Sequence, residues 1–87
     1  MGFLGGSAYG MARDVGEGYI LLNANLLKRM NAEELRSLRF EIDRILTGVR
    51  GEQPKIDDMP AIQSRNRKIS RLHSAVLMIN NQLQSLR

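Results

Sequence analysis

Cysteine and tryptophan are absent from these 87 residues, and histidine occurs only once. Without cysteine the chain has no disulfide, no thiolate nucleophile and no cysteine-based zinc site. The one histidine, His73, has no second histidine or cysteine with which to share a metal ion. No apolar run approaches the roughly 18 residues that a membrane-spanning helix needs. These absences predict a protein that holds no cofactor or metal and does not enter a membrane.

The N-terminal residues carry no recognisable targeting signal. A secretory signal would show a basic start and an uninterrupted apolar stretch, and both are missing. A myristoylation signal would need Ser or Thr at position 6, where the chain has Gly6. Because the lack of cysteine also suits a reducing compartment, we expect a cytoplasmic protein.

Side chains that could converge on a catalytic centre are sparse. Asp57 and Asp58 are adjacent acids, but as capping residues ahead of Pro60 they need no catalytic role. His73 falls beside the predicted packing face of its helix and is expected to be a boundary residue rather than a general base. The glycines near the N-terminus lack the Gly-Lys-Ser ending of a phosphate-binding loop. We therefore predict that the protein is not an enzyme.

Residues 1–18 contain six of the eight glycines in the chain. No apolar periodicity is visible among them, and ordering a glycine-rich segment costs conformational entropy. We therefore predict a flexible tail over residues 1–18 that could fold onto a partner, followed by a helical hairpin domain over residues 19–87.

Hydrophobic spacing and capping signals predict an all-α hairpin domain with helices over about residues 24–30, 32–47 and 59–86. Asn31, followed three residues later by Glu34, has the form of a capping box and predicts the start of the second helix. Gly48 predicts the end of that helix. Acidic residues ahead of Pro60 predict the start of the last one.

The last predicted helix carries a heptad pattern. With Ile62 as position a, seven of its eight a and d positions are aliphatic, and Arg65 is the exception. This row of positions, called the seam below, predicts that one face of the helix packs against other helices. The pattern fits a coiled coil, and it fits equally one packed face of a compact helical bundle.

One hairpin is not expected to cover the whole seam. At 1.5 Å per residue the last helix is about 40 Å long and the preceding one about 25 Å. Residues 75–79 are apolar without interruption, so Leu77 and Met78 lie off the seam and the segment is expected to be buried all round. Phe40 lies off the apolar stripe of its own helix. The helix over residues 24–30 or a second copy of the chain could supply the missing cover, and we favour a homodimer.

The predicted interface combines the apolar stripe of the second helix with the seam and the side chains beside it. These side chains are apolar and are expected to pack against helices of the same chain or of a second copy. They are Leu35, Leu38, Ile42, Ile45, Ile69, Leu72, Val76, Leu77, Met78, Ile79, Leu83 and Leu86.

Charge is distributed unevenly along the chain. The net charge is +4, and residues 59–87 contain basic residues but no acidic one. Four of the basic residues are candidates for contacts with the phosphate backbone of a nucleic acid, namely Arg65, Arg67, Lys68 and Arg71. The alternative is a basic face that is solvated or paired with acids of the neighbouring helix. Arg65 in particular could pair with Asp43 or Glu41, or could be exposed at the end of the bundle.

Two functions are compatible with this sequence. The leading hypothesis is a non-enzymatic helical interaction module, an adaptor or small regulatory subunit that acts through protein–protein contacts. The alternative is a small basic regulator that binds the phosphate backbone of a nucleic acid through the last helix. No aromatic residue lies among the basic ones to stack on unpaired bases, which disfavours single-stranded targets.

Overall fold

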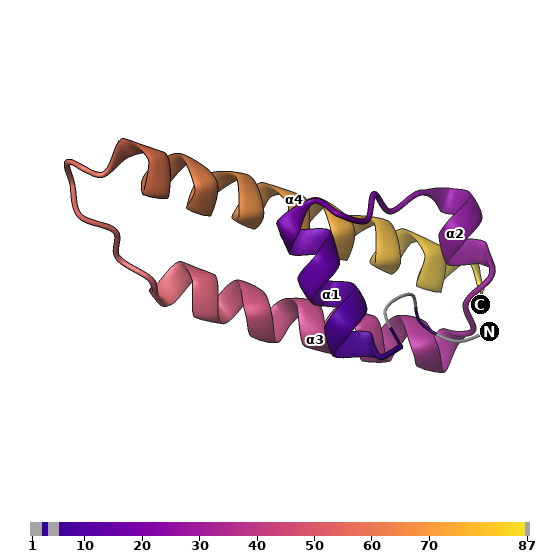
Figure 1. The fold of residues 1–87 in the computed structure, drawn as a ribbon. Coiled ribbons are helices and arrows are strands. Elements are labelled where there is room, and N and C mark those ends of the chain that lie inside the picture. The colour runs from indigo at the N-terminus through magenta and orange to yellow at the C-terminus, as the bar shows by residue number, and fades with distance from the viewer. Residues whose placement is uncertain (1–2, 4–5, 87) are drawn as a thin grey trace.

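The computed structural model describes residue 3 and residues 6–86. Within these residues the chain forms four helices and no strand (Figure 1). The helices are α1 (Ala8–Glu17), α2 (Ala24–Lys28), α3 (Ala32–Gly51) and α4 (Met59–Ser85). α3 and α4 lie side by side and antiparallel, and α1 packs across both of them. The predicted all-α class is confirmed.

α3 begins as the sequence predicts but ends later. Asn31 Oδ1 accepts a hydrogen bond from the backbone N–H of Glu34 at 2.8 Å, and Glu34 Oε1 accepts one from the backbone N–H of Asn31 at 3.0 Å, which completes the capping box. The predicted end near residue 47 is wrong. Gly48 does not adopt the left-handed conformation of a C-cap glycine, and Val49 adds a further buried position to the helix. The helix therefore continues to Gly51.

α4 is close to its predicted length. Asp58 Oδ1 accepts a hydrogen bond from the backbone N–H of Ala61 at 3.2 Å, and Pro60 stands in the first turn, where its missing N–H is not needed. Leu72 and Ile79 of the seam are buried. Ala75 lies off the seam and is buried as well, because the N-terminal part of the chain packs against this side of α4.

The N-terminal segment corrects the prediction of a flexible tail over residues 1–18. From Ala8 onward this segment is a helix with a cap at each end. Ser7 Oγ accepts a hydrogen bond from the backbone N–H of Gly10 at 2.9 Å, and Gly18 ends the helix in the left-handed conformation. The part of the prediction that concerns residues 1–2 and 4–5 lies outside the described residues.

Burial explains why α1 is ordered despite its glycines. Met11, Ala12 and Val15 face the hairpin and are buried, so the apolar area removed from water offsets the entropy lost by the glycines. Gly16 permits the close approach, since a Cβ there would lie 3.3 Å from Leu72 Cδ2. The glycines in this segment therefore serve packing and do not make it disordered.

One apolar core joins all four helices. Its most enclosed large side chains are Met11, Leu27, Leu35, Leu38, Ile42, Leu72 and Ile79. α1 and α2 thus supply within one chain much of the cover for α4 that the sequence assigned to a short helix or to a second copy. Across residue 3 and residues 6–86, every helix is too short or too polar to cross a membrane.

Candidate functional site

The predicted interface residues differ widely in exposure. Five are buried in the core, namely Leu35, Leu38, Ile42, Leu72 and Ile79. Five are half-buried at its margin, namely Ile45, Ile69, Val76, Met78 and Leu83. Leu77 and Leu86 are 55% and 49% exposed. Within one chain Leu77 is therefore not enclosed, whereas most of the set packs within that chain.

Arg65 binds the C-terminal end of α3 instead of a carboxylate. Its Nε donates to the backbone oxygens of Val49 at 3.2 Å and Glu52 at 3.0 Å, and its Nη2 donates to that of Arg50 at 3.0 Å. A cation at this position also complements the partial negative charge of the helix end. Asp43 and Glu41, the acids that the sequence suggested as its partners, do not pair with Arg65. Glu41 pairs instead with Arg44, whose Nη1 lies 3.0 Å from Glu41 Oε1.

Two more of the basic candidates hold the end of α1 against α4. Lys68 Nζ lies 3.0 Å from Glu17 Oε1. Arg71 Nη1 donates to the backbone oxygen of Gly16 at 3.2 Å, and its guanidinium lies beside Gly18. These contacts turn both side chains toward α1, while Arg65 is turned toward the end of α3.

Arg67 is the fourth basic candidate and differs from the other three. Its side chain is exposed and, within the described part of the chain, makes no hydrogen bond or ion pair. At about 100° per residue, Arg67, Arg71, Ser74 and Met78 follow one row along α4. Arg67 and Arg71 therefore lie on the row that leads to Met78, whereas Arg65 and Lys68 contact the end of α3 and the end of α1.

An apolar groove lies between α4 and the segment that follows α1. Gly18 turns the chain, and the backbone N–H groups of Tyr19 and Ile20 both donate to the carbonyl oxygen of Asp14, at 2.8 and 3.3 Å. Residues 20–23 then run without helical structure along α4 before Asn23 caps α2. Local turn chemistry thus places this segment beside the helix.

We call this depression the α4 groove. It has a volume of about 300 Å³, and its walls include Val15, Ile20, Leu21, Arg71, Ala75 and Met78. Leu21 stands at its edge with 87% of its surface exposed. No acidic residue lines it among the residues that the structure describes. The α4 groove therefore combines an apolar interior with one basic side chain at its wall.

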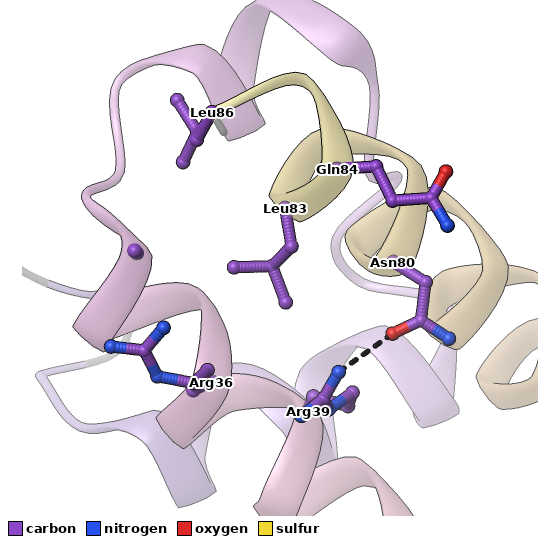
Figure 2. Close-up of a pocket in the computed structure, with 7 residues that line it drawn as sticks. Arg36, Arg39, Asn80, Leu83, Gln84 and Leu86 are labelled. Atoms are coloured by element: carbon purple, nitrogen blue, oxygen red, sulfur yellow. Dashed lines mark hydrogen bonds between the residues drawn. The ribbon is translucent and has the colours of Figure 1, made fainter.

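A second cavity, of about 510 Å³, lies where the first turns of α3 approach the end of α4 (Figure 2). Arg36 and Arg39 project from α3, and Asn80 and Leu83 project from α4. Arg39 Nη1 donates to Asn80 Oδ1 at 2.9 Å, which ties the two helices together. This cavity is more polar than the α4 groove, and its one internal hydrogen bond has an evident structural role.

The chain matches no protein-family model, and comparison with curated proteins and with solved structures found no match.

Residues with catalytic or metal-binding chemistry do not converge in the described part of the chain. No group of three or more His, Asp or Glu side chains could hold a metal ion there. His73 is exposed on α4. Asp58 caps α4, as predicted, whereas Glu17 pairs with Lys68.

The α4 groove was not predicted, because its N-terminal wall was taken to belong to a tail. The sequence does contain signals for a helix in this segment. Ser7 is a standard N-cap residue, and Met11 and Val15 follow it at helical spacing, with Gly18 as a C-cap. The number of glycines outweighed these signals in our interpretation.

Proposed function

We propose that this protein is a non-enzymatic helical interaction module, an adaptor or small regulatory subunit, that binds another protein through the α4 groove. The observation that supports this best is the exposure of Leu21 beside an apolar groove. A single exposed leucine is common on protein surfaces. An exposed leucine at the rim of a groove that also contains Ile20, Ala75 and Met78 marks a surface that a partner can cover.

The size of the groove favours a protein partner over a small ligand. Its volume of about 300 Å³ is at the lower end of the range of roughly 300–1,000 Å³ typical of small-molecule pockets. It is also open along the surface instead of being enclosed. Such a groove accepts a few apolar side chains of a larger molecule. The absence of cysteine from the sequence supports a reducing compartment such as the cytoplasm as the place of action.

The alternative proposal, phosphate-backbone binding through α4, has less support. Arg65, Lys68 and Arg71 each bond to another part of the chain. Binding to a nucleic acid would then depend mainly on Arg67 and Arg71, and two such contacts give a weak, strongly salt-dependent affinity. Anisotropy of labelled duplex DNA and structured RNA at low and moderate salt measures this directly.

We also propose a homodimer, although cover for α4 is no longer the main reason to expect one. α1 and α2 cover much of the part of α4 that we expected a second copy to cover. The apolar side chains that remain exposed outside the α4 groove include Leu77 and Leu86 on α4 and Phe40 on α3, and the guanidinium of Arg44 lies 6.0 Å from the Phe40 ring centre. Sedimentation of the wild-type protein and of Leu77→Asp tests whether two copies associate.

The experiment that tests the proposed function compares two substitutions at nearby positions. Affinity capture from cells is carried out with the wild-type protein, with Leu21→Asp and with Tyr19→Asp, whose side chain is 80% exposed but does not line the groove. We expect at least one protein that is recovered by wild type and Tyr19→Asp and lost with Leu21→Asp, and that binds again when purified. If Leu21→Asp recovers the same proteins as wild type, the α4 groove is not the binding site.

A further inference from the structure

We infer that the partner segment bound by the α4 groove is an amphipathic helix whose apolar row is flanked by acidic residues. This inference rests on the proposed function and adds the chemistry of the partner to it. Three observations carry it, namely the apolar interior of the groove, the charge along its α4 wall and the length of that wall.

The interior of the groove selects aliphatic side chains. Val15 and Ala75 are buried beneath it, and Ile20 and Met78 are half-buried at its sides. Methionine is flexible and adapts its shape to an incoming side chain. With Leu21 almost fully exposed, a partner that covers this edge removes a whole leucine side chain from water, which favours binding.

The charge along the α4 wall selects an acidic flank. Arg71 lies at the wall, and Arg67 precedes it by about one turn on the same row. α4 itself contains no acidic residue, and none lines the groove among the described residues, while the nearby carboxylate of Glu17 pairs with Lys68. Carboxylates of a partner can therefore pair with Arg67 and Arg71 along this row.

Arg71 is held ready for such a contact. One of its N–H groups donates to the backbone oxygen of Gly16, which fixes the direction of the side chain. A guanidinium has five N–H donors in a planar fork, so one bond to the backbone leaves donors for a carboxylate. The partner then binds an arginine that has already lost part of its rotamer freedom, which reduces the entropy cost of association.

The length of the wall fits a helix. From Ser70 to Met78 the α4 wall extends for about 12 Å at 1.5 Å per residue, which equals a little over two turns of a partner helix, and Arg67 lies about one turn before Arg71 on the same row. Apolar side chains at positions i, i+3, i+4 and i+7 of an amphipathic helix would point into the groove, as in other helix-in-groove complexes.

A second copy of this chain fits the groove less well than an acidic partner. The protein carries a net charge of +4 and the α4 row is basic, so two copies that meet through this surface would bring Arg67 and Arg71 of both chains together. Like charges placed opposite each other oppose association. An acidic helix avoids this repulsion and uses the same apolar contacts.

The test uses three designed peptides of about 18 residues that share one apolar row of leucines and differ only in the flanking residues, which are Glu, Gln or Lys. Each is labelled with fluorescein and titrated with the full chain while anisotropy is measured. We expect the Glu peptide to bind at least about five-fold more tightly than the Gln peptide, and the Lys peptide to bind most weakly. The preference for Glu should shrink as salt is raised from about 50 to about 300 mM.

Variants show whether the binding occurs at the α4 groove. Arg67→Glu, which removes no contact within the chain, should weaken binding of the Glu peptide about three- to ten-fold and leave the Gln peptide nearly unchanged. Arg36→Glu on α3 changes the net charge equally but lies outside the groove, and it should have little effect. Leu21→Asp, which removes an apolar side chain from the edge of the groove, should reduce binding of the Glu and Gln peptides.

The outcomes separate the inference from the proposed function. Equal binding of the Glu and Gln peptides, with loss of both in Leu21→Asp, overturns the acidic partner and leaves the α4 groove as a protein-binding site. Equal weakening by Arg67→Glu and Arg36→Glu means that net charge alone acts, and it also overturns the inference. If none of the peptides binds, the groove does not accept a helix, while the capture experiment with Leu21→Asp still decides the proposed function. Self-association that Leu21→Asp abolishes would identify a second copy as the occupant.

Discussion

Two requirements meet at Gly18. Its φ of 86° lies in the left-handed region, and a Cβ at this position would lie 3.0 Å from Arg71 Cζ. An L-residue with a side chain loses about 1–2 kcal/mol in that backbone conformation. It would in addition displace the guanidinium that holds the end of α1 against α4.

We therefore expect Gly18→Ala to lower the free energy of unfolding by about 2 kcal/mol, measured by urea denaturation followed by circular dichroism. Gly48→Ala is the matched control. Gly48 lies inside α3 without a positive φ, and a Cβ there would meet no other part of the fold within 4 Å, so alanine should raise the free energy of unfolding by about 0.5–1 kcal/mol. Equal stability of the two variants would contradict the role assigned to Gly18.

Arg65 is the second residue whose role is specific. Its guanidinium donates to the backbone oxygens of residues 49, 50 and 52 at the end of α3, and of these the oxygen of Val49 also accepts a hydrogen bond from the backbone N–H of Glu52 at 3.1 Å. We expect Arg65→Ala to lower the free energy of unfolding by about 1–3 kcal/mol, and Arg65→Lys, which keeps the charge but loses the fork, to fall between alanine and wild type. Arg67→Ala should change stability by less than about 0.5 kcal/mol, and a similar loss in both alanine variants would refute the capping role.

Residue roles that depend on neighbours in sequence were predictable, and roles that depend on another helix were not. The capping box of Asn31 and Glu34 and the cap by Asp58 involve residues three apart, so their pattern is visible in the sequence. Arg65 and Arg71 act on residues 13 or more positions away. An arginine at a seam position signals a special environment, but spacing alone does not say which helix end it binds.

At the scale of helices, the contribution of α1 to the stability of the fold can be measured directly. Met11 is 1% exposed and belongs to the core, whereas Tyr9 on the same helix is 51% exposed. If α1 is an integral helix, Met11→Ala should lower the free energy of unfolding by about 2–4 kcal/mol, because it leaves a cavity between α1 and the hairpin. Tyr9→Ala should have a much smaller effect. A Met11→Ala variant as stable as wild type would mean that the N-terminal segment behaves as a flexible tail.

The hairpin was predictable because its signals extend over many residues. The seam of α4 repeats over four heptads, and the stripe of α3 includes Leu35, Leu38 and Ile42 at helical spacing. α1 has only ten residues, and three glycines in or next to it lower its intrinsic helix propensity. Its stability comes from tertiary burial, which local sequence patterns do not reveal. The α4 groove, whose wall follows α1, was missed for the same reason.

At the scale of the whole molecule, the position of Ile79 changes how association can be tested. Ile79 is fully enclosed by residues of its own chain, so a charge placed there would unfold the monomer and would say nothing about a dimer. Leu77, two residues earlier, is largely exposed and can be changed to Asp without disturbing the core. Association and folding are therefore separable in this protein by the choice of residue.

At the same scale, the apolar core is complete within one chain, and this determines how stability should respond to dilution. A fold that requires a second copy becomes less stable on dilution, because mass action then favours unfolded monomers. In this protein α1, α2 and α3 all contact α4 and bury its central residues within a single chain. We therefore expect the midpoint of thermal unfolding to stay constant over about a 100-fold dilution within the concentration range where sedimentation finds monomers, because the folded monomer needs no partner. A midpoint that falls steadily on dilution would show that the second copy is part of the fold, as the heptad pattern allows.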